Sequence, residues 1–347
     1  MNLHSDTPFW LVKEGLLADY PRLTADASAD AVVIGGGVSG ALVADALEER
    51  GVDTIVVERR HVGFGSTSAS TALLQYEIDH PLFQLVDEVG ESHAFRAYEL
   101  CAAAIGQLQK ICARLPGKAE FRRRPSLWVA STQKDARTIL APEHDARVAA
   151  GFDVRWLDAH EMERKFGFAA PAAILSELGA TCHPYRLTAD LLASFAARGG
   201  RVFDLTEIVG WKEGRSSVEL TTAAGHRLRA RHVVVAAGYE SQAFLDRLVT
   251  RFHSTYAIVS KPGTKRPWHR DAMLWETKKP YFYARTLADG RIVAGGRDVT
   301  FQSPHKRDAL IARKGRELRR DFAKWFPQVP FEVDFAWAGT FGETRDG

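Results

Sequence analysis

The spacing of apolar positions near the start of the chain changes twice between residues 31 and 58. Residues 31–34, Ala-Val-Val-Ile, are an uninterrupted apolar run, which is typical of a strand covered on both faces. Over residues 38–50 the apolar side chains recur at helical spacing, and residues 53–58 form a second short run that ends in Glu58. The pattern predicts a strand, a turn, a helix that ends at Gly51, and a second strand.

The turn carries three spaced glycines, Gly35, Gly37 and Gly40, in a G-x-G-x-x-G pattern. In such a unit the first glycine permits a tight turn, the second lets a pyrophosphate approach the backbone, and the third lets helix and strand pack closely. The pyrophosphate would lie on the free N–H groups of the helix N-terminus. Glu58 is spaced to bind the ribose hydroxyls of an adenosine, so the unit predicts a dinucleotide site.

Glycine, serine and threonine dominate the stretch after Glu58, over residues 63–72. Alone this composition indicates a flexible loop, but behind a nucleotide-binding unit it suggests a second backbone nest around the same ligand. Arg59 and Arg60 leave open a phosphorylated nicotinamide cofactor, whose 2′-phosphate they could bind, although Glu58 argues against it.

The rest of the chain predicts helices and strands in mixed order. Helical periodicity covers residues 81–115, the segment up to about 150, and residues 158–165, 188–197 and 306–326. Strand patterns cover residues 121–130, 173–177, 201–204, 207–211, 217–221, 226–228, 232–238, 252–260, 272–276, 281–285, 291–295 and 332–340. Asp289-Gly290 predicts a hairpin turn, and the apolar strand at 232–238 is expected to return to the first, parallel sheet.

Composition narrows the class of protein. With 46% hydrophobic residues and a mean hydropathy of −0.19, the 347-residue chain is expected to be globular, with two domains or one carrying an inserted lobe. The net charge of +3 argues weakly against a dedicated nucleic-acid binder. The three cysteines form no C-x-x-C pair, so neither a metal site nor a disulfide framework is expected. The sequence shows no signal-peptide pattern and no apolar run that could span a bilayer, which favours a cytoplasmic protein.

Six segments in order resemble the family of FAD-dependent amine and amino-acid oxidases, which includes D-amino-acid, glycine, sarcosine and γ-glutamylputrescine oxidoreductases. They are VVIGGGVSG with Glu58, VGFGSTSASTALL, HPYRLTADLLASFAARGGRVF, VVVAAG, YFYARTLADGRIVAGGRD and WAGTFGETRDG. The resemblance implies an α/β protein, α+β overall, in which a Rossmann-type FAD-binding domain carries an inserted substrate domain of mixed β-sheet and helices. We expect the FAD-binding domain at 1–80, 151–250 and 335–347, and the substrate domain at 81–150 and 251–334.

The resemblance also implies FAD as the cofactor, bound noncovalently because no cysteine follows Cys182. The implied contacts to the ADP half are Gly35, Gly37, Val38, Ser39, Gly40, Glu58 and Arg59. Those along the ribityl chain and ring are Ser66, Thr67, Ser70, Thr71, Ala72 and Leu73, while Ile208, with Ala237 and Gly238 nearby, would lie at the adenine.

The reaction implied is hydride transfer from a carbon bearing an amine to flavin N5, giving an imine that water hydrolyses. Tyr256, Tyr283 and Arg285 alternate on strands expected to face the ring, with Trp337 on the last strand. Arg285 could bind a substrate carboxylate through its forked guanidinium. The alternatives are a surface arginine and two core tyrosines with hydrogen-bonded hydroxyls.

Two other functions stay open from the sequence. In the family a further strand, a helix and a glycine-rich turn that contacts the flavin follow the position of Gly347, so relative to that pattern the chain is expected to be shortened at its C-terminus. A nucleotide-binding protein without turnover would fit that expectation. An RNA-modifying flavoprotein would use the basic runs at 122–124 and 313–320, but solvated charged faces explain these more simply, and no nucleic-acid partner is expected. The expected partner is a small amine or amino acid.

Overall fold

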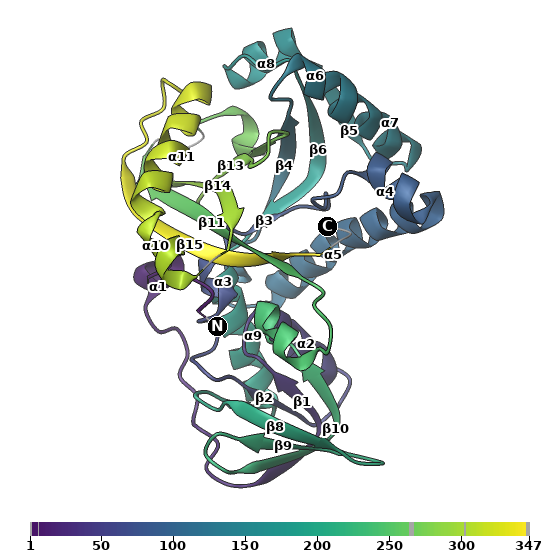
Figure 1. The fold of residues 1–347 in the computed structure, drawn as a ribbon, viewed down its shortest axis with the longest axis vertical. Coiled ribbons are helices and arrows are strands. Elements are labelled where there is room, and N and C mark those ends of the chain that lie inside the picture. The colour runs from purple at the N-terminus through teal and green to yellow at the C-terminus, as the bar shows by residue number, and fades with distance from the viewer. Residues whose placement is uncertain (1, 6, 264–266, 302, 345–347) are drawn as a thin grey trace. The chain divides into compact units, whose positions relative to one another are not determined.

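The computed structural model describes residues 2–5, 7–263, 267–301 and 303–344. These residues form two compact units, each built around its own sheet (Figure 1). Unit 1 comprises Met1–Ser70, Arg114–Ala119 and His183–Thr250, and unit 2 comprises Thr71–Ala113, Glu120–Cys182 and Arg251–Gly347. Each unit is therefore assembled from three separate stretches of sequence.

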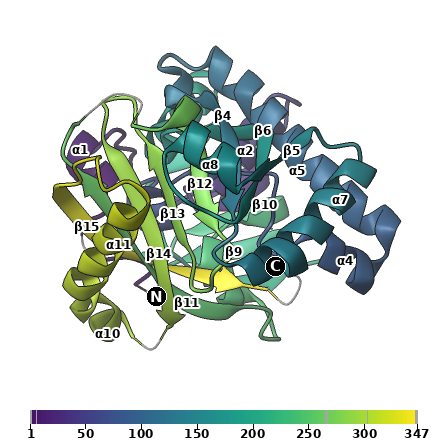
Figure 2. The same cartoon turned by 90° about the horizontal axis from the view of Figure 1, so that it is seen from above.

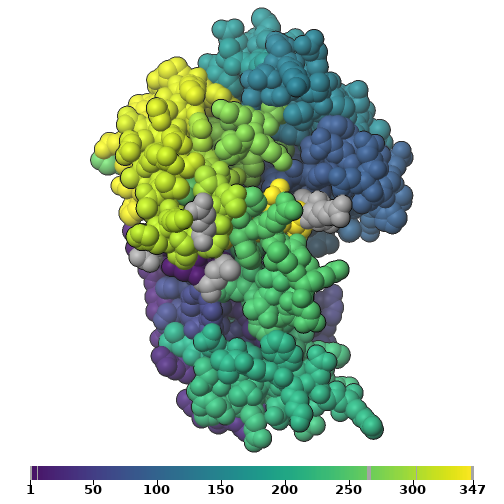
Figure 3. Space-filling model, in the orientation of Figure 1, coloured from purple at the N-terminus to yellow at the C-terminus, as the bar shows by residue number. Residues whose placement is uncertain are grey.

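A six-stranded sheet lies at the centre of unit 1, in the order β7-β2-β1-β10-β9-β8. Its strands are β1 (Ala27–Ile34), β2 (Thr54–Val57), β7 (Arg201–Phe203), β8 (Ile208–Glu213), β9 (Val218–Thr222) and β10 (Arg227–Val235). β7, β2, β1 and β10 run parallel, and β9 and β8 are added to β10 as antiparallel strands. Residues of β8 and β9 form part of the outer surface of this unit (Figure 3). Val32 and Val33, successive residues of β1 that point to opposite faces of the sheet, are both fully buried, which confirms the predicted strand covered on both faces.

Two longer helices and two short ones belong to unit 1. They are α2 (Val38–Glu48) and α9 (Pro184–Ala197), with α1 (Phe9–Glu14) and α3 (Ser66–Ala69). α2 and α9 pack against each other (Figure 1), and α2 can approach closely because Ala41 and Ala44 are fully buried small residues. The parallel strands with α2 between β1 and β2 confirm the Rossmann-type prediction.

Unit 2 is built on a nine-stranded mixed sheet in the order β15-β11-β14-β13-β12-β4-β6-β3, with β5 paired to β6. The strands are β3 (Leu73–Leu74), β4 (Arg122–Val129), β5 (Val154–Asp158), β6 (Ala172–Thr181), β11 (Arg251–Ser260), β12 (Met273–Glu276), β13 (Phe282–Thr286), β14 (Ile292–Thr300) and β15 (Val333–Glu343). The Asp289-Gly290 hairpin is confirmed, because Leu287 N–H bonds the Arg291 carbonyl at 2.8 Å between the antiparallel strands β13 and β14.

Helices cover this second sheet. They are α4 (Leu82–Val89), α5 (Glu91–Arg114), α7 (Ala141–Ala149), α8 (Ala159–Phe166), α10 (Pro304–Ala309) and α11 (Ile311–Trp325). The shorter helical segments of unit 2 are α6 (Gln133–Asp135), η2 (Ala136–Leu140) and η4 (His269–Asp271). Segment η3 (Gly238–Phe244) belongs to unit 1, and η1 (Lys118–Glu120) begins in unit 1 and ends in unit 2. The single helix expected at 81–115 is two helices, because Gly90 takes a φ of +83° between α4 and α5.

The main core of unit 2 lies under helix α11. This helix packs on β11, β14 and β15 (Figure 2), where Leu318 and Phe322 are fully buried against Ile258. This cluster fills one face of the sheet, and on the opposite face of β4 and β6 the side chains of Trp128 and Ile174 belong to a second buried cluster.

The compact units differ from the predicted domains at four places. Residues 71–80, with β3, belong to unit 2, and residues 114–119 belong to unit 1. The other two places lie within the predicted FAD-binding domain. Residues 151–182 and the described part of 335–347 carry β5, β6 and β15, whose ladders belong to the unit 2 sheet. Residues 345–347 lie outside the described residues. The assignment of residues 71–80, 151–182 and 335–347 to the FAD-binding domain stays a prediction.

Among the described residues, no helix combines the length with the apolar composition that crossing a bilayer requires.

Candidate functional site

In the glycine turn after β1, nearby backbone atoms leave no space for a side chain at two positions. Gly35 has a φ of +114°, and a Cβ there would lie 2.4 Å from the carbonyl oxygen of Ala236. A Cβ on Gly40 would lie 1.9 Å from the Gly35 carbonyl oxygen and 3.4 Å from a methyl of Val33. The tight turn and the close helix packing predicted for these two glycines are confirmed, although Gly40 is limited more by the turn than by the strand.

The N-terminus of α2 faces the segment at residues 63–72, which is rich in serine and threonine and is called the hydroxyl-rich segment below. Gly37 caps the helix without a side chain, and the Val38 N–H, ahead of Ser39, donates to Thr67 Oγ1 at 3.0 Å. A Cβ on Gly37 would lie 3.1 Å from the same oxygen. Two segments predicted to contact one ligand therefore meet at the positive end of the helix dipole, where an anion is favoured.

Glu58 directly follows β2, and its carboxylate is oriented by two backbone donors. The Gly36 N–H bonds Oε2 and the Arg60 N–H bonds Oε1, both at 2.8 Å, and the residue is only 9% exposed. Each carboxylate oxygen can still accept a further bond. This placement at the turn supports the ribose role, and the middle glycine, Gly36, is a contributor that the spacing pattern did not single out.

The arginines after Glu58 are engaged by acidic side chains of unit 1. Arg59 pairs with Glu240 and lies 3.8 Å from Glu207, and Arg60 Nη1 lies 3.4 Å from Glu240. Acidic partners oppose a 2′-phosphate at this position, which weakens the nicotinamide alternative. Contact of Arg59 with the ADP half stays a prediction.

The segment Ser66–Ser70 contains an unsatisfied buried hydroxyl. Ser66 Oγ is buried and has no hydrogen-bond partner among the described residues. An unpaired buried polar group costs roughly 1–3 kcal/mol, which a hydrogen-bonding ligand would recover. Together with the cradle at Gly37 and the donors of α2, this oxygen shows that the residues of unit 1 fit an FAD molecule.

Of the remaining predicted cofactor residues, Ala237 and Gly238 follow β10 close to the same turn, whereas Ile208 lies on another strand of unit 1 and Ala72 and Leu73 belong to unit 2. The Ala237 backbone nitrogen lies 3.2 Å from the Cβ position of Gly35, and Gly238 follows with a φ of +58°. Ile208 opens the edge strand β8, and Ala72, with a φ of +51°, precedes the Leu73 pairing with β6 in unit 2. Ligand contact by these residues stays a prediction.

In unit 2 the strand register places Tyr256 on the face covered by α11. Tyr256 aligns with Gly296 and, through it, with Phe282, a member of the main core. The Tyr256 ring is 1% exposed, with Lys314 Nζ 5.6 Å from its centroid. The expectation that Tyr256 shares a face with the other two candidates is wrong. It is a core aromatic, although its hydroxyl has no hydrogen-bond partner among the described residues.

Tyr283 and Arg285 lie together on the opposite face of this sheet. Tyr283 aligns with Gly295 and with Ala257, which in turn pairs with Trp337. A Cβ on Gly295 would lie 2.2 Å from the Tyr283 hydroxyl, so the Gly-Gly pair in β14 is the sequence signal that lets the ring lie across that strand. The Tyr283, Arg285 and Trp337 side chains therefore share one face.

Both candidate side chains are in low-dielectric surroundings. Burial raises the pKa of Tyr283 to about 12, and its hydroxyl accepts a hydrogen bond from Thr71 Oγ1 at 3.2 Å. Burial lowers the pKa of Arg285 to about 10, partly offset by Cys182 and Glu120, and its Nη2 donates to the Cys182 carbonyl at 3.1 Å. Arg285 is 3% exposed, so the surface-arginine alternative is wrong.

Sequence reasoning missed one carboxylate on β14, Asp298. Burial raises its pKa, a hydrogen bond to Thr255 acts the other way, and Oδ1 has no hydrogen-bond partner among the described residues. Its charge is also among the causes that raise the pKa of Tyr283. The predicted strand ended at 295, whereas β14 runs to Thr300 past an irregularity in its pairing with β11, so simple alternation could not assign Asp298 to a face.

Within unit 1, Asp19, His61 and Asp204 bring three potential metal-binding atoms within 4.8 Å of one another. Asp204 is already bonded by His61 Nδ1 and by the Val62 N–H, each at 3.1 Å. An internal hydrogen-bonded dyad accounts for this cluster.

Comparison with known proteins agrees with this geometry. The FAD dependent oxidoreductase family model, DAO, matches residues 30–347. Gamma-glutamylputrescine oxidoreductase of Escherichia coli (strain K12) is 24% identical, with 93% of this chain and 76% of that protein aligned. Glycine oxidase of Bacillus licheniformis is 26% identical, with 92% of this chain and 82% of that protein aligned.

Coverage differs among relatives. The chain spans about half, 48%, of YhfW of Bacillus subtilis (strain 168), described as a Rieske 2Fe-2S iron-sulfur protein, at 22% identity. Among solved structures, glycine oxidase from Geobacillus kaustophilus superposes with a TM-score of 0.76 over 92% of this chain and 84% of that one, at 19% identity. Sequence and fold agree, and the chain belongs to the DAO family of FAD-dependent oxidoreductases.

Proposed function

We propose that this protein oxidises a C–N bond of a small amine or amino acid, with FAD as a noncovalently bound cofactor. The observation that carries the proposal is the pair Tyr283 and Arg285 on one buried face of the unit 2 sheet, in a chain of the DAO family. Curated relatives named for glycine and for γ-glutamylputrescine support an amine substrate.

When bound, FAD supplies the two-electron oxidation by taking a hydride from the carbon that bears nitrogen. The protein's part is to bind, orient and exclude water. The Arg285 guanidinium is charged at neutral pH, since its pKa of about 10 lies well above it, and its fork suits a carboxylate. The Tyr283 hydroxyl, neutral and held by Thr71, offers a fixed polar contact beside it.

Reduction of the bound flavin tests the proposal. Protein purified with added FAD is expected to be yellow, and its visible flavin band should bleach without oxygen when glycine, proline, sarcosine or γ-glutamylputrescine is added. With glycine, sarcosine or γ-glutamylputrescine, release of ammonia or of a primary amine together with the matching carbonyl product would identify hydrolysis of the imine, whereas proline would give a cyclic imine that releases neither.

The two alternatives give different results. A yellow protein that no amine or amino acid reduces would indicate a flavin-binding protein without turnover. A folded protein that stays colourless in excess FAD would overturn the proposed function altogether.

A further inference from the structure

An N-terminal strap, residues 7–20, precedes the first strand of unit 1 and lies outside the region matched by the family model. It contains the six-residue helix α1, whose Phe9 and Trp10 are 2% and 1% exposed. Helix α1 packs on α3 within unit 1. A tail exposed to solvent would not bury two large aromatic side chains, so the strap is part of the packed unit.

The strap contacts the hydroxyl-rich segment directly. Trp10 Nε1 donates to the carbonyl oxygen of Ser70 at 2.8 Å, just after α3 ends. Upstream of the strap, His4 Nε2 lies 2.7 Å from the carbonyl oxygen of Phe64, just before α3 begins. Both ends of the segment that carries Ser66 and Thr67 are therefore bonded to the N-terminal residues.

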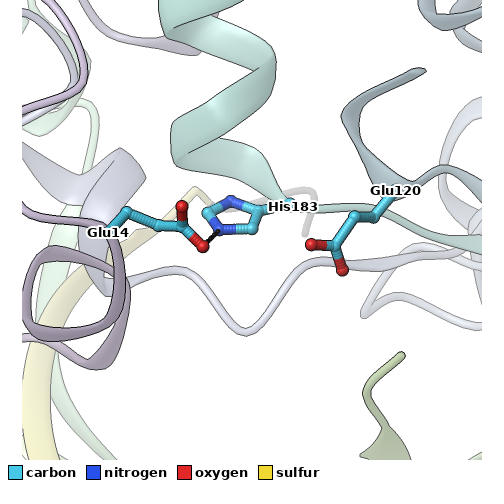
Figure 4. Close-up of side chains that lie close together, drawn as sticks. All are labelled: Glu14, Glu120 and His183. Atoms are coloured by element: carbon cyan, nitrogen blue, oxygen red, sulfur yellow. Dashed lines mark hydrogen bonds and ion pairs between the residues drawn. The ribbon is translucent and has the colours of Figure 1, made fainter. Parts of the chain in front are cut away.

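The strap is in turn fixed to the start of α9. The Trp10 ring lies 4.1 Å from the His183 ring, and the Glu14 carboxylate points at His183 Nε2, 3.3 Å away (Figure 4), while also pairing with Arg186. His183 Nδ1 accepts from the Arg186 N–H at 3.1 Å and so caps the helix. His183 thus both caps α9 and anchors the strap.

A second anchor involves the Tyr185 hydroxyl. It donates to the Gly15 carbonyl and accepts from the Leu17 N–H, both at 3.1 Å. The same ring lies against the backbone of Gly63, where a Cβ would come within 2.6 Å of it. Tyr185 therefore contacts both the strap and the start of the hydroxyl-rich segment.

From these contacts we infer that Trp10 is a positioning residue that holds the segment Gly65–Ser70 in its FAD-binding conformation. Helix α3 has four residues, and a helix this short is unstable without outside contacts. Its C-terminal end is fixed by Trp10, whereas its N-terminal side is bonded to the glycine turn through Thr67. Loss of the Trp10 bond should disturb the flavin half of the site more than the ADP half. The inference rests on FAD being the ligand of unit 1.

The variant Trp10→Phe keeps an aromatic ring against His183 but removes the N–H donor. We expect its dissociation constant for FAD to rise roughly fivefold, the equivalent of one net hydrogen bond, and its dissociation constant for ADP to stay unchanged. The fine structure of the bound flavin's visible band should also broaden as the segment loosens. Trp211→Phe is the matched control, because Trp211 is 49% exposed on β8 and stacks on Phe244 instead.

The outcomes separate the inference from the proposed function. Equal FAD affinity in wild type and Trp10→Phe, or equal loss of FAD and ADP, would overturn the inference while leaving the proposed function standing. A wild-type protein that binds ADP but no FAD would overturn both. If Trp10→Phe fails to fold, Tyr185→Phe removes the second anchor alone and should weaken FAD, but not ADP, in the same direction.

Discussion

Under the proposed function, the charge of one buried side chain, Arg285, would decide which substrates the unit 2 face prefers. Its guanidinium is 3% exposed, and burial lowers its pKa to about 10 without neutralising it. A buried cation costs free energy unless it is paired or hydrogen-bonded. Its bond to the Cys182 carbonyl supplies one such contact, and a substrate carboxylate would add a charge-assisted one.

Replacing Arg285 with methionine should distinguish amino acids from plain amines as substrates. Hydrogen bonds to a charged group contribute about 1.5–3 kcal/mol, so KM for an amino acid should rise roughly 10- to 150-fold. KM for an amine of the same chain without the carboxylate should change little. Steady-state rates with both substrates check this, with flavin content measured to confirm an intact site.

Tyr256→Phe is the control for this experiment, because Tyr256 lies on the opposite face of the same sheet. Its hydroxyl has no hydrogen-bond partner among the described residues, so both KM values should stay at wild-type level. An equal rise in both KM values for Arg285→Met would show that Arg285 does not bind a carboxylate.

At the scale of elements, the turn between β1 and α2 depends on the absence of one Cβ. In Gly40→Ala the new methyl would lie 1.9 Å from the Gly35 carbonyl oxygen, so α2 must shift away from the turn. Overpacking of this kind costs about 1–3 kcal/mol of the free energy of unfolding. Urea unfolding should show that loss, and titration with FAD should show weaker binding because the donors of α2 move.

Gly210→Ala on β8 is the matched control. A Cβ at Gly210 meets nothing within 4 Å, and glycine in a strand interior costs roughly 0.5–1 kcal/mol relative to alanine. The control should therefore be as stable as wild type or slightly more so. A Gly40→Ala protein as stable as this control would refute the steric account of the turn.

The elements around this turn could be predicted from the sequence because the residues that determine them lie close together in the chain. The apolar runs, the three glycines and Glu58 lie within residues 31–58, and each steric role depends on neighbours in that stretch or on the small residues at 236–237. The break at Gly90 was missed because helical periodicity continues on both sides of it. A glycine can be tolerated in a helix or can end it, and composition alone does not decide which.

The faces of the unit 2 strands could not be predicted in the same way. The pairing of β11 with β14 shifts between Ser254 and Tyr256, and such a shift changes which side chains share a face. Tyr256 and Tyr283 lie on separate strands, so alternation within each gives no information about the relation between them. Asp298 was missed for the same reason, and strand order across the sheet is a long-range property.

At the scale of the whole molecule, buried ionisable groups act on stability in opposite directions as pH changes. Burial raises the pKa values of Glu143 and Asp298, so the folded protein holds protons that the unfolded chain releases. Their contribution to stability therefore falls as pH rises above their ordinary values. His183 acts in the other direction, since burial lowers its pKa from 6.5 to about 4, against the opposing effect of Glu14.

His183 should therefore make the protein less stable in mild acid. Between pH 6.5 and about pH 4 the unfolded chain binds a proton that the folded His183 does not, so the free energy of unfolding falls with pH by roughly 3 kcal/mol over this window.

His183→Asn isolates this contribution, because asparagine also caps a helix but does not titrate. The unfolding free energy of the variant, measured by urea titration, should be lower than that of wild type by a constant amount above pH 6.5, because the contacts of His183 with Trp10 and Glu14 are lost, and should fall less steeply with pH below it. Glu14 has a lowered pKa and loses its own contribution as pH falls below its ordinary value of 4.5, so part of the slope should remain in the variant. Identical slopes in the two proteins would mean that His183 takes up its proton in the folded state, and that its bond to Glu14 outweighs its burial.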